Sequence, residues 1–489
     1  MLAGCSTLQP LSQPRVSALA PANGLLWSDT EGVRQEDWYH LLNEGPDALS
    51  WRLRAIDSAT RSLDLQTFLW KPDRSGLSVL RQIMVAADRG VRIRILLDDT
   101  FTIHEDHLLV RLSAHPAIDV RIYNPFARRF DSFVLREAFS INEFARIDRR
   151  MHNKLMLVDN RVAIVGGRNI ADEYFGLHAE ANFRDLEVIL FGDPVGRSSA
   201  LFDSYWNSPW AYPVEQVVGG NDAVHDVQSF REWLADSASP RVPEDPASTR
   251  AAWKRAARDA VGGNALLFSD EPATADPLQY PDASDKLAAA LVHMVADADD
   301  EIVIVTAYLI PTPQLEAAFR QAARKGVRIR VLTNSLRSNN HTAAHSAYRG
   351  FIRRLMSIGI EMHEVRAEAK DRHLYMARPV ADKHLALHAK ILLVDDDLTF
   401  VGSANLDPRS LHLNTEVGVL VDSPALNRRV REQIAVDFSE RNAWRLAVGP
   451  DDRLQWIGDD IVLQTQPAES GFQRLEDWFF SLLPIRNEL

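Results

Sequence analysis

The sequence predicts an α/β protein of two homologous lobes, each a mainly parallel sheet flanked by helices, with the active site at the lobe interface. Two observations lead to this fold class. A strand–helix–strand pattern at residues 62–99 returns at residues 301–335. A short motif built around a histidine and a lysine follows each of these patterns. Repeated units of this kind imply parallel strands with helices on both faces of the sheet.

Each strand–helix–strand unit can be justified element by element. Its first strand is apolar, and a helical stretch follows after a loop. The helices end near Gly90 and Gly326, because glycine readily adopts the left-handed conformation that stops a helix. The second strand then begins with Val-Arg-Ile-Arg in both units. Residues 239–250 are rich in Ser and Pro, so we expect them to belong to the connection between the lobes.

The motif places a histidine and a lysine two residues apart in each lobe. The first copy has His152 and Lys154, and the second has His388 and Lys390. In a strand, residues i and i+2 point to the same face, so each pair is expected to share one face. A run of four apolar residues follows each pair, which is typical of a strand buried on both faces.

The motif continues at identical spacing in both copies. Asp159 and Asp395 close the apolar runs, and we expect them to fix the turns there. Gly166 and Gly402, and then Asn169 and Asn405, follow at equal distances from their histidines. One copy could be a half-buried histidine and a lysine at the end of a core strand. Two copies that match over five positions argue for a functional role instead.

Carboxylates stand downstream of both histidines, at comparable places. They are Asp185 and Glu416. A histidine that attacks as the neutral base needs its far ring nitrogen held by an acceptor. We expect Asp185 to pair with His152 and Glu416 with His388, or the two carboxylates to be exchanged between lobes. The alternative for each is a surface residue of a strand.

These residue types suit phosphoryl chemistry. Two lysines and two asparagines can bind the non-bridging oxygens of a phosphate, which carry negative charge throughout the reaction. Two histidines suit a double displacement at phosphorus. One would be a nucleophile that forms a phospho-histidine. The other would protonate the leaving alcohol and then activate the acceptor.

The double pattern H-x-K-x4-D-x6-G-[GS]-x-N resembles the signature of the phospholipase D superfamily. Within it, stretches such as "RRMHNK", "VGGRNIADEYFG" and "GSANLDPRS" are most similar to bacterial cardiolipin synthases of the type C branch. The resemblance implies a metal-independent enzyme without a cofactor, in which His152 is the nucleophile and His388 the acid and base. It also implies that the motif lysines and asparagines bind phosphate. The sequence departs at Gly167, where the second copy has Ser403, so a hydroxyl beside the phosphate is expected only in the second half-site.

The resemblance implies a phosphatidyl transferase that makes cardiolipin from two phospholipids, namely phosphatidylglycerol with itself or with phosphatidylethanolamine. A phospholipase D that releases phosphatidic acid is the main alternative. A membrane-associated scaffold without turnover is a distant one, because both histidines, both lysines and both asparagines are present. The net charge of -12 over 489 residues argues against nucleic acid as a partner.

The chain is expected to divide into a tether at 1–24, a first lobe at 25–212, a connecting segment at 213–262 and a second lobe at 263–489. Near the start, Leu-Ala-Gly-Cys ending at Cys5 resembles the end of a bacterial lipoprotein signal. We therefore expect a membrane-associated protein of the bacterial cell envelope, with Cys5 as a candidate lipid anchor.

Other polar residues are weaker candidates. His104 and His107 could be part of a metal site, although a solvated loop is the simpler interpretation and no metal is expected. His341 and His345, and likewise Asp98 and Asp99, stand near the carboxyl ends of predicted strands, where ligand crevices form.

Two aromatic features remain. Trp70 and Tyr308 sit at corresponding strand ends and could form the walls of a lipid groove together with the loop 174–183, or pack in the core. The C-terminal stretch is amphipathic. We expect it to dock on the second lobe, and contact with a membrane interface is the alternative. Its apolar residues are Phe472, Leu475, Trp478, Phe479, Leu482 and Leu483.

Overall fold

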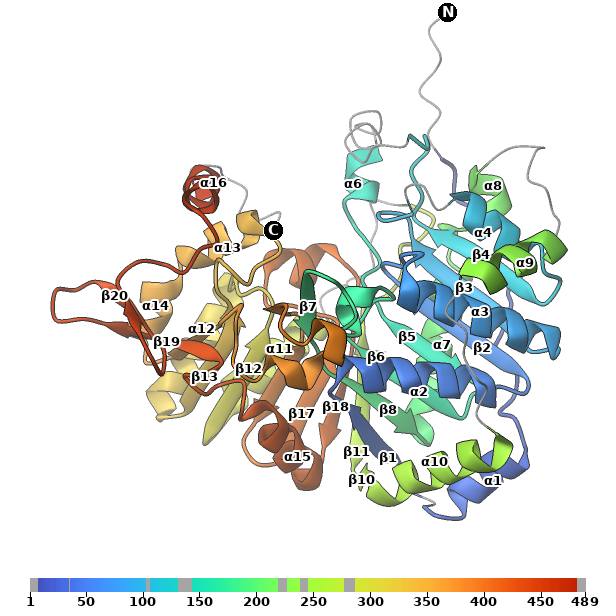
Figure 1. Ribbon diagram of the computed structural model, residues 1–489, viewed down its shortest axis with the longest axis horizontal. Coiled ribbons are helices and arrows are strands. Elements are labelled where there is room, and N and C mark those ends of the chain that lie inside the picture. The colour runs from blue at the N-terminus through green and yellow to red at the C-terminus, as the bar shows by residue number, and fades with distance from the viewer. Residues whose placement is uncertain are drawn as a thin grey trace, which may run out of the picture.

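Two sheets stand side by side in the computed structural model, each covered by helices on its outer face (Figure 1). The structure describes residues 8–34, 36–102, 106–130, 143–218, 227–237, 245–276 and 286–481. The first lobe is on the right of Figure 1 and the second on the left. The α/β fold of two similar lobes that the sequence predicts is confirmed.

In the described residues, the first lobe holds a nine-stranded sheet in the order β10-β1-β8-β6-β5-β2-β3-β4-β9. Its strands are β1 (Trp38–Leu42), β2 (Ser62–Thr67), β3 (Arg92–Asp98), β4 (Ile118–Tyr123), β5 (Leu155–Val158), β6 (Val162–Gly166), β8 (Glu187–Phe191), β9 (Ala211–Pro213) and β10 (Val261–Gly262). Its helices are α1 (Leu25–Glu31), α2 (Gly45–Ser58), α3 (Arg74–Asp88), α4 (Asp106–Ser113), α6 (Phe144–Ile147), α7 (Asp193–Trp206), α8 (Val214–Val218), α9 (Val227–Ser237) and α10 (Pro246–Asp259), with a short 3₁₀ turn η2 (Asp172–Tyr174).

The second lobe holds a ten-stranded sheet in the order β11-β18-β17-β16-β12-β13-β14-β19-β20-β21 among the described residues. Its strands are β11 (Asn264–Ser269), β12 (Glu301–Thr306), β13 (Arg328–Asn334), β14 (Glu361–Val365), β16 (Lys390–Val394), β17 (Leu398–Gly402), β18 (Val417–Asp422), β19 (Ala443–Val448), β20 (Leu454–Ile457) and β21 (Val462–Leu463). Its helical elements are α11 (Lys286–Asp297), α12 (Pro313–Lys325), α13 (Thr342–Arg349), α14 (Ile352–Ser357), α15 (Pro424–Ile434), α16 (Gly471–Ser481), η4 (Arg372–Tyr375), η5 (Arg378–Val380) and η6 (Arg409–Leu413).

The two sheets share one plan. The predicted strand–helix–strand units are β2-α3-β3 and β12-α12-β13, and their strands pair in parallel. A third parallel strand follows in each lobe, β4 and β14. The motif strands β5 and β16 join the other side of β2 and β12 antiparallel. Parallel pairing is therefore confined to three neighbouring strands in each lobe, and antiparallel strands extend each sheet on both sides of them.

The apolar runs after each histidine fill two cores at once. Leu155 and Leu157 of β5 pack in a core shared by the two lobes, where Ile391 and Leu393 of β16 also lie. The alternate residues of each strand face the opposite way, as in Met156 of β5, which packs in the core of the first lobe. Strand side chains alternate between faces, so a strand between two cores must be apolar throughout.

The helix stops are formed by glycine as the sequence predicts. Gly90 follows α3 with φ of 89°, and Gly326 caps α12 with φ of 87°. At the other end of α12, Thr312 accepts a hydrogen bond from the backbone N–H of Leu315. These caps set where each helix begins and ends, and so where the next strand enters the sheet.

The chain passes between the lobes at Gly263, because β10 pairs with β1 and β11 pairs with β18. Before this crossing, Phe230, Leu234 and Trp253 of α9 and α10 pack in the core of the first lobe. The connecting segment is thus partly built into that lobe.

The first described residues lie along the first lobe. The backbone N–H of Val16 donates to Asn207 Oδ1 at 2.8 Å, and that of Ala18 donates to Asp203 Oδ2 at 2.7 Å. The described part of the expected tether at 1–24 therefore forms a strap along the first lobe, held by hydrogen bonds of its backbone. Cys5 lies outside the described residues. Among the described helices, none combines the length and the hydropathy that crossing a bilayer requires.

Candidate active site

A small sheet between the lobes brings the first carboxylate to the second histidine. Strand β7 (Ala181–Arg184) pairs in parallel with β15 (His384–Leu387). The ladder continues past the strands, where the backbone N–H of His388 donates to the Arg184 carbonyl at 2.9 Å. The next residue on each strand thereby comes face to face. Asp185 Oδ2 lies 2.8 Å from His388 Nδ1.

The same arrangement recurs at the other histidine. Met151 and Thr415 form a parallel bridge between the lobes, and the N–H of His152 donates to the Thr415 carbonyl at 2.9 Å. Both carboxylate oxygens of Glu416 lie 2.9 Å from His152 Nδ1. Each lobe therefore supplies the carboxylate for the histidine of the other lobe.

This exchange decides between the two pairings that the sequence leaves open. The pairing of Asp185 with His152 and of Glu416 with His388 is wrong. The physical reason is that β7 and Thr415 pair with backbone of the opposite lobe, which carries each carboxylate across the interface.

Burial sets the protonation state of both histidine rings, and the carboxylates set their tautomer. Burial, together with the nearby charge of Lys390, lowers the pKa of His388 to about 3. Burial also lowers the pKa of His152. Burial alone would raise the pKa of Asp185, but the hydrogen bond from His388 and nearby positive charges outweigh it and lower that pKa. A neutral ring that donates Nδ1–H to an ionised carboxylate leaves Nε2 as the reactive nitrogen.

Each motif lysine folds back on its histidine. Lys154 Nζ donates to the backbone carbonyl of His152 at 2.6 Å. Lys390 Nζ lies 3.1 Å from His388 Nδ1 and also contacts the His388 carbonyl. Burial lowers the pKa of Lys390 to about 8 and lowers the pKa of Lys154 well below its ordinary value. A bound anion beside these two lysines would favour their charged forms, so the site suits an anion.

Both histidines line one cleft of about 650 Å³ between the lobes. Asn169 and Asn405 line it too. Asn169 is held in place, because its Oδ1 accepts from the N–H of Leu69 at 3.2 Å and its Nδ2 donates to the Tyr174 hydroxyl at 2.8 Å. The structure therefore brings the two histidines and two asparagines of the motif together in one cleft.

Aromatic rings pack against both histidines. The ring of Phe68 lies 4.9 Å from that of His152 at 72°. Tyr174 lies 5.0 Å from His388 at 90°, and Phe183 packs on the same ring. Tyr174 and Phe183 begin and end the predicted wall loop, and Tyr308 also lines the cleft. Sequence reasoning missed Phe68, although its place at the end of β2 beside Trp70 could have indicated it.

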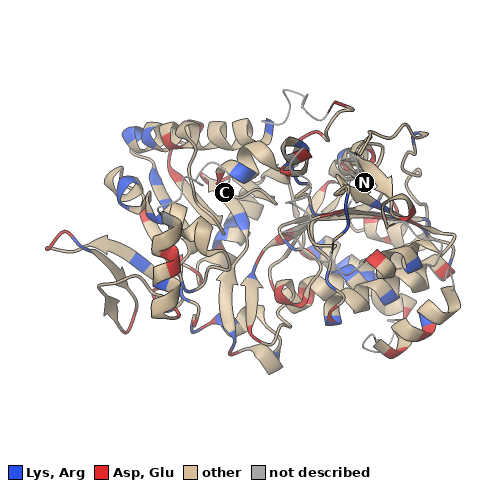
Figure 2. Ribbon diagram, turned by 90° about the horizontal axis from the view of Figure 1, so that it is seen from above, with Lys and Arg blue, Asp and Glu red and all other residues tan. Residues whose placement is uncertain are grey.

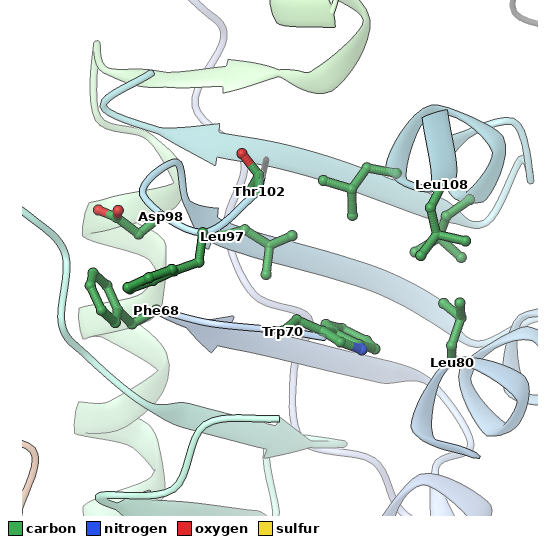
Figure 3. A pocket seen from close by; sticks show the side chains of 10 residues that line it. Phe68, Trp70, Leu80, Leu97, Asp98, Thr102 and Leu108 are labelled. Atoms are coloured by element: carbon green, nitrogen blue, oxygen red, sulfur yellow. The ribbon is translucent and has the colours of Figure 1, made fainter. Parts of the chain in front are cut away.

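Trp70 does not line this cleft. It lines a neighbouring apolar pocket of about 20 Å³ in the first lobe, together with Leu80, Leu97 and Leu108 (Figure 3). Its indole N–H donates to the Gly76 carbonyl at 3.2 Å. Trp70 therefore packs at the edge of the core, which is the second interpretation that the sequence allows.

Ser403 has a different place from the one predicted. It is buried, and its hydroxyl donates to a carboxylate oxygen of Glu416 and lies 3.0 Å from the N–H of Val417. The hydroxyl thus braces the carboxylate that holds His152, and it does not stand free beside a phosphate. At Gly167 a Cβ would lie 2.5 Å from Asp185 Oδ1, so the shorter carboxylate occupies that space in the other half-site.

The motif aspartates hold the fold at the far ends of the motif strands. Asp159 accepts hydrogen bonds from the backbone N–H groups of Thr60, Arg61 and Ser62. Asp395 does the same for residues 299–301. Both aspartates have positive φ, 54° and 48°. Each is separated from its histidine by a whole strand and ties the turn to the start of the neighbouring strand, so neither aspartate touches the histidine rings.

Asp98 and Asp99 are buried and serve other partners. Asp98 forms an ion pair with Arg150 at 2.7 Å and accepts from the N–H of Met151 at 2.9 Å. It thus positions the residues just before His152. Asp99 pairs with Arg129 at 2.6 Å. Neither aspartate lines the cleft, but Arg150 does, and sequence reasoning did not single it out.

The remaining candidate histidines differ in whether they line the cleft. His341 lines the cleft, with its ring 6.2 Å from that of Tyr308. His345 is fully buried, its Nδ1 lies 3.1 Å from Asp477, and it does not line the cleft. His107 lies in α4, and His104 is outside the described residues. The part of the chain that is described holds no cluster of three or more His, Cys, Asp or Glu with metal-site geometry.

Known proteins resemble this chain over both lobes. The family model described as "Cardiolipin synthase, PLD-like domain" matches residues 53–190 and 291–438, one match in each lobe. Cardiolipin synthase C of Escherichia coli is 32% identical over 453 residues, which cover 91% of this chain and 94% of that protein. Cardiolipin synthase B of Escherichia coli is 25% identical over 401 residues, covering 82% and 80%.

A solved structure supports the fold. The crystal structure of phosphatidylserine synthase from Haemophilus influenzae superposes with a TM-score of 0.59, covering 95% of this chain and 100% of that one at 13% identity. Together with the family match over both lobes, these findings place the protein: the chain is an enzyme of the phospholipase D superfamily and belongs to its cardiolipin synthase family.

Proposed function

We propose that the protein is a phosphatidyl transferase that makes cardiolipin from two phospholipids through a covalent phospho-histidine. The observation that carries this proposal is the pair of histidines in one cleft, each oriented by a carboxylate of the opposite lobe. Membership of the cardiolipin synthase family supports the substrate class. Charge on the phosphate is met by Lys154 and Lys390, so the chemical step needs no metal ion.

In the first step, Nε2 of His152 attacks the phosphorus of phosphatidylglycerol, and the bond from phosphorus to the glycerol headgroup breaks. His388 gives a proton to the departing glycerol oxygen. The His388 ring is neutral near pH 7, because burial lowers its pKa to about 3. The negative charge of the bound phosphodiester beside the two lysines raises that pKa and allows His388 to carry the proton.

In the second step, His388 takes a proton from the headgroup hydroxyl of a second phosphatidylglycerol. The resulting oxygen attacks the phosphorus, the bond from phosphorus to His152 breaks, and cardiolipin leaves. With phosphatidylethanolamine as donor, ethanolamine departs in the first step and phosphatidylglycerol is the acceptor.

Transfer must compete with hydrolysis, since bulk water at about 55 M is the alternative acceptor of the phosphatidyl group. The aromatic walls of the cleft, Phe68, Tyr174, Phe183 and Tyr308, restrict water and favour a lipid acceptor held in line. A protein associated with the bacterial cell envelope would also meet acceptors at high local concentration. Figure 2 shows Lys and Arg interspersed with Asp and Glu over both lobes, a distribution that argues against nucleic acid as the partner.

Mass spectrometry of the products tests the proposal. Purified protein is mixed with phosphatidylglycerol vesicles, with and without phosphatidylethanolamine. We expect cardiolipin as the main product and phosphatidic acid as a minor one. Phosphatidic acid as the main product at every acceptor concentration would make the protein a phospholipase D hydrolase with the same two-histidine chemistry.

A further inference from the structure

The C-terminal helix α16 is docked on the second lobe by its polar side. Asp477 is 1% exposed, and its Oδ1 lies 3.1 Å from His345 Nδ1 while its Oδ2 pairs with Arg349 at 2.9 Å. Its backbone carbonyl accepts from the Ser346 hydroxyl at 2.8 Å. Gln473, one turn earlier, donates to the Leu336 carbonyl at 2.9 Å. The expected docking therefore occurs, but polar contacts make it.

The apolar side of the same helix points away from the protein. Phe472 is 73% exposed, Leu475 56% and Phe479 54%. They are spaced i, i+3 and i+7, so they form one continuous stripe along the helix. An apolar stripe this exposed is unusual on a soluble surface and marks an interaction site. We call these three residues the α16 stripe.

Helix α13 connects the α16 stripe to the cleft. Helix α16 rests on α13, as Figure 1 shows at the top of the second lobe. His341, which precedes α13, and Ala344 within it both line the catalytic cleft. One side of α13 thus forms the cleft wall, and another carries the helix with the exposed stripe.

We propose that the α16 stripe inserts into the interface of a phospholipid bilayer and places the catalytic cleft beside its lipid substrates. This inference rests on the proposed function, because it takes phospholipids as the substrates. Phe and Leu side chains on a short amphipathic helix are suited to the boundary between headgroups and acyl chains. Arg474, exposed on the same helix, can meet lipid phosphates.

A second protein copy fits the stripe less well than a bilayer does. A fully buried aromatic side chain covers roughly 150–250 Å², so three side chains supply only a few hundred. Stable protein–protein interfaces bury about 1,200–2,000 Å². A bilayer has no such minimum, because insertion strength simply grows with the apolar area buried.

Vesicle flotation of the full chain tests the inference without any turnover. The test variant is Phe472→Ser/Leu475→Ser/Phe479→Ser, and the matched control is Leu25→Ser/Leu266→Ser, which removes apolar residues 75% and 52% exposed on the first lobe and the lobe junction. All proteins carry Cys5→Ser, so that no lipid anchor hides the effect. Vesicles contain phosphatidylglycerol and phosphatidylethanolamine.

We expect the test variant to lose vesicle binding by at least about tenfold and the control to bind as the parent does. Thermal unfolding and activity on detergent-dispersed lipid should stay unchanged in both, since the stripe has no part in the chemistry. Unchanged vesicle binding of the test variant overturns the inference. A parent dimer that the substitutions convert to a monomer, with vesicle binding retained, also overturns it. Stripe-dependent binding by a parent that makes no cardiolipin would reject the proposed function alone.

Discussion

Asp185 of the first lobe lies 2.8 Å from Nδ1 of His388 in the second lobe. Glu416 mirrors this contact at His152 from the opposite direction. The two half-sites are therefore interlocked, and each histidine depends on a carboxylate that folds in the other lobe.

The interlocked carboxylates should act as positioning residues. Asp185→Asn and Glu416→Gln remove the acceptor that fixes the ring tautomer, and we expect each to lower kcat by about 10²–10⁴ while KM changes little. Steady-state kinetics on phosphatidylglycerol vesicles measure this. Asp88→Asn is the control, because Asp88 lies 3.2 Å from His115 outside the cleft. A matching loss in the control, or a loss confined to KM, would contradict the assignment.

A trapping experiment should distinguish the roles of the two histidines. His152→Ala should form no phospho-enzyme with any substrate, because it lacks the nucleophile. His388→Ala should still form one from a substrate with a p-nitrophenol leaving group, which needs no proton. Acid-quenched samples analysed by mass spectrometry locate the phosphatidyl group. Label retained in His152→Ala but lost in His388→Ala would reverse the two roles.

Lys390 should set the alkaline limit of activity. Its pKa is lowered to about 8 by burial, so it is charged below that pH and neutral above it. The value of kcat/KM, which reports on the free enzyme, should therefore fall as the pH rises through about 8. Lys390→Arg keeps the charge and should move this fall to higher pH, even if the maximum is lower. An identical alkaline limb in the variant would show that another group titrates there.

Substitution of Gly167 by any larger residue should lower activity. A Cβ would lie 2.5 Å from Asp185 Oδ1, so the carboxylate would have to move away from His388. We expect Gly167→Ala to lower kcat by about a hundredfold, the cost of a small misplacement in a reacting site. Gly196→Ala is the control, since no atom lies within 4 Å of the added Cβ. Near-parental activity of Gly167→Ala would show that the contact does not hold Asp185.

The sequence predicted much of this site, and the failures have a common cause. Matched spacing identified the motif residues, because the two copies repeat local strands and turns. The partners of His152 and His388 were left open, since β7 and β15 pair across a long sequence separation that local patterns do not encode. Ser403 was misplaced because its hydroxyl donates to Glu416 from the end of the neighbouring strand, a side-chain contact that the motif spacing does not encode.

The C-terminal helix illustrates a second limit. Periodicity identifies an apolar stripe, but it does not tell which side of the helix meets the protein. Here one tertiary contact sets the orientation of the helix, because the buried Asp477 pairs with His345 and Arg349 of α13. The polar side has a partner on the lobe, and the apolar side is left outside.

The exchange of carboxylates also links catalysis to the docking of the two halves. A lobe that folded alone would hold a histidine with no acceptor at Nδ1 and a carboxylate with no histidine to orient. A small sliding of one lobe against the other would disturb both rings together, because the β7–β15 ladder and the Met151–Thr415 bridge lie across the same interface. A shift between the lobes should therefore disable both histidines at once, and the catalytic activity depends on the correct docking of the two lobes.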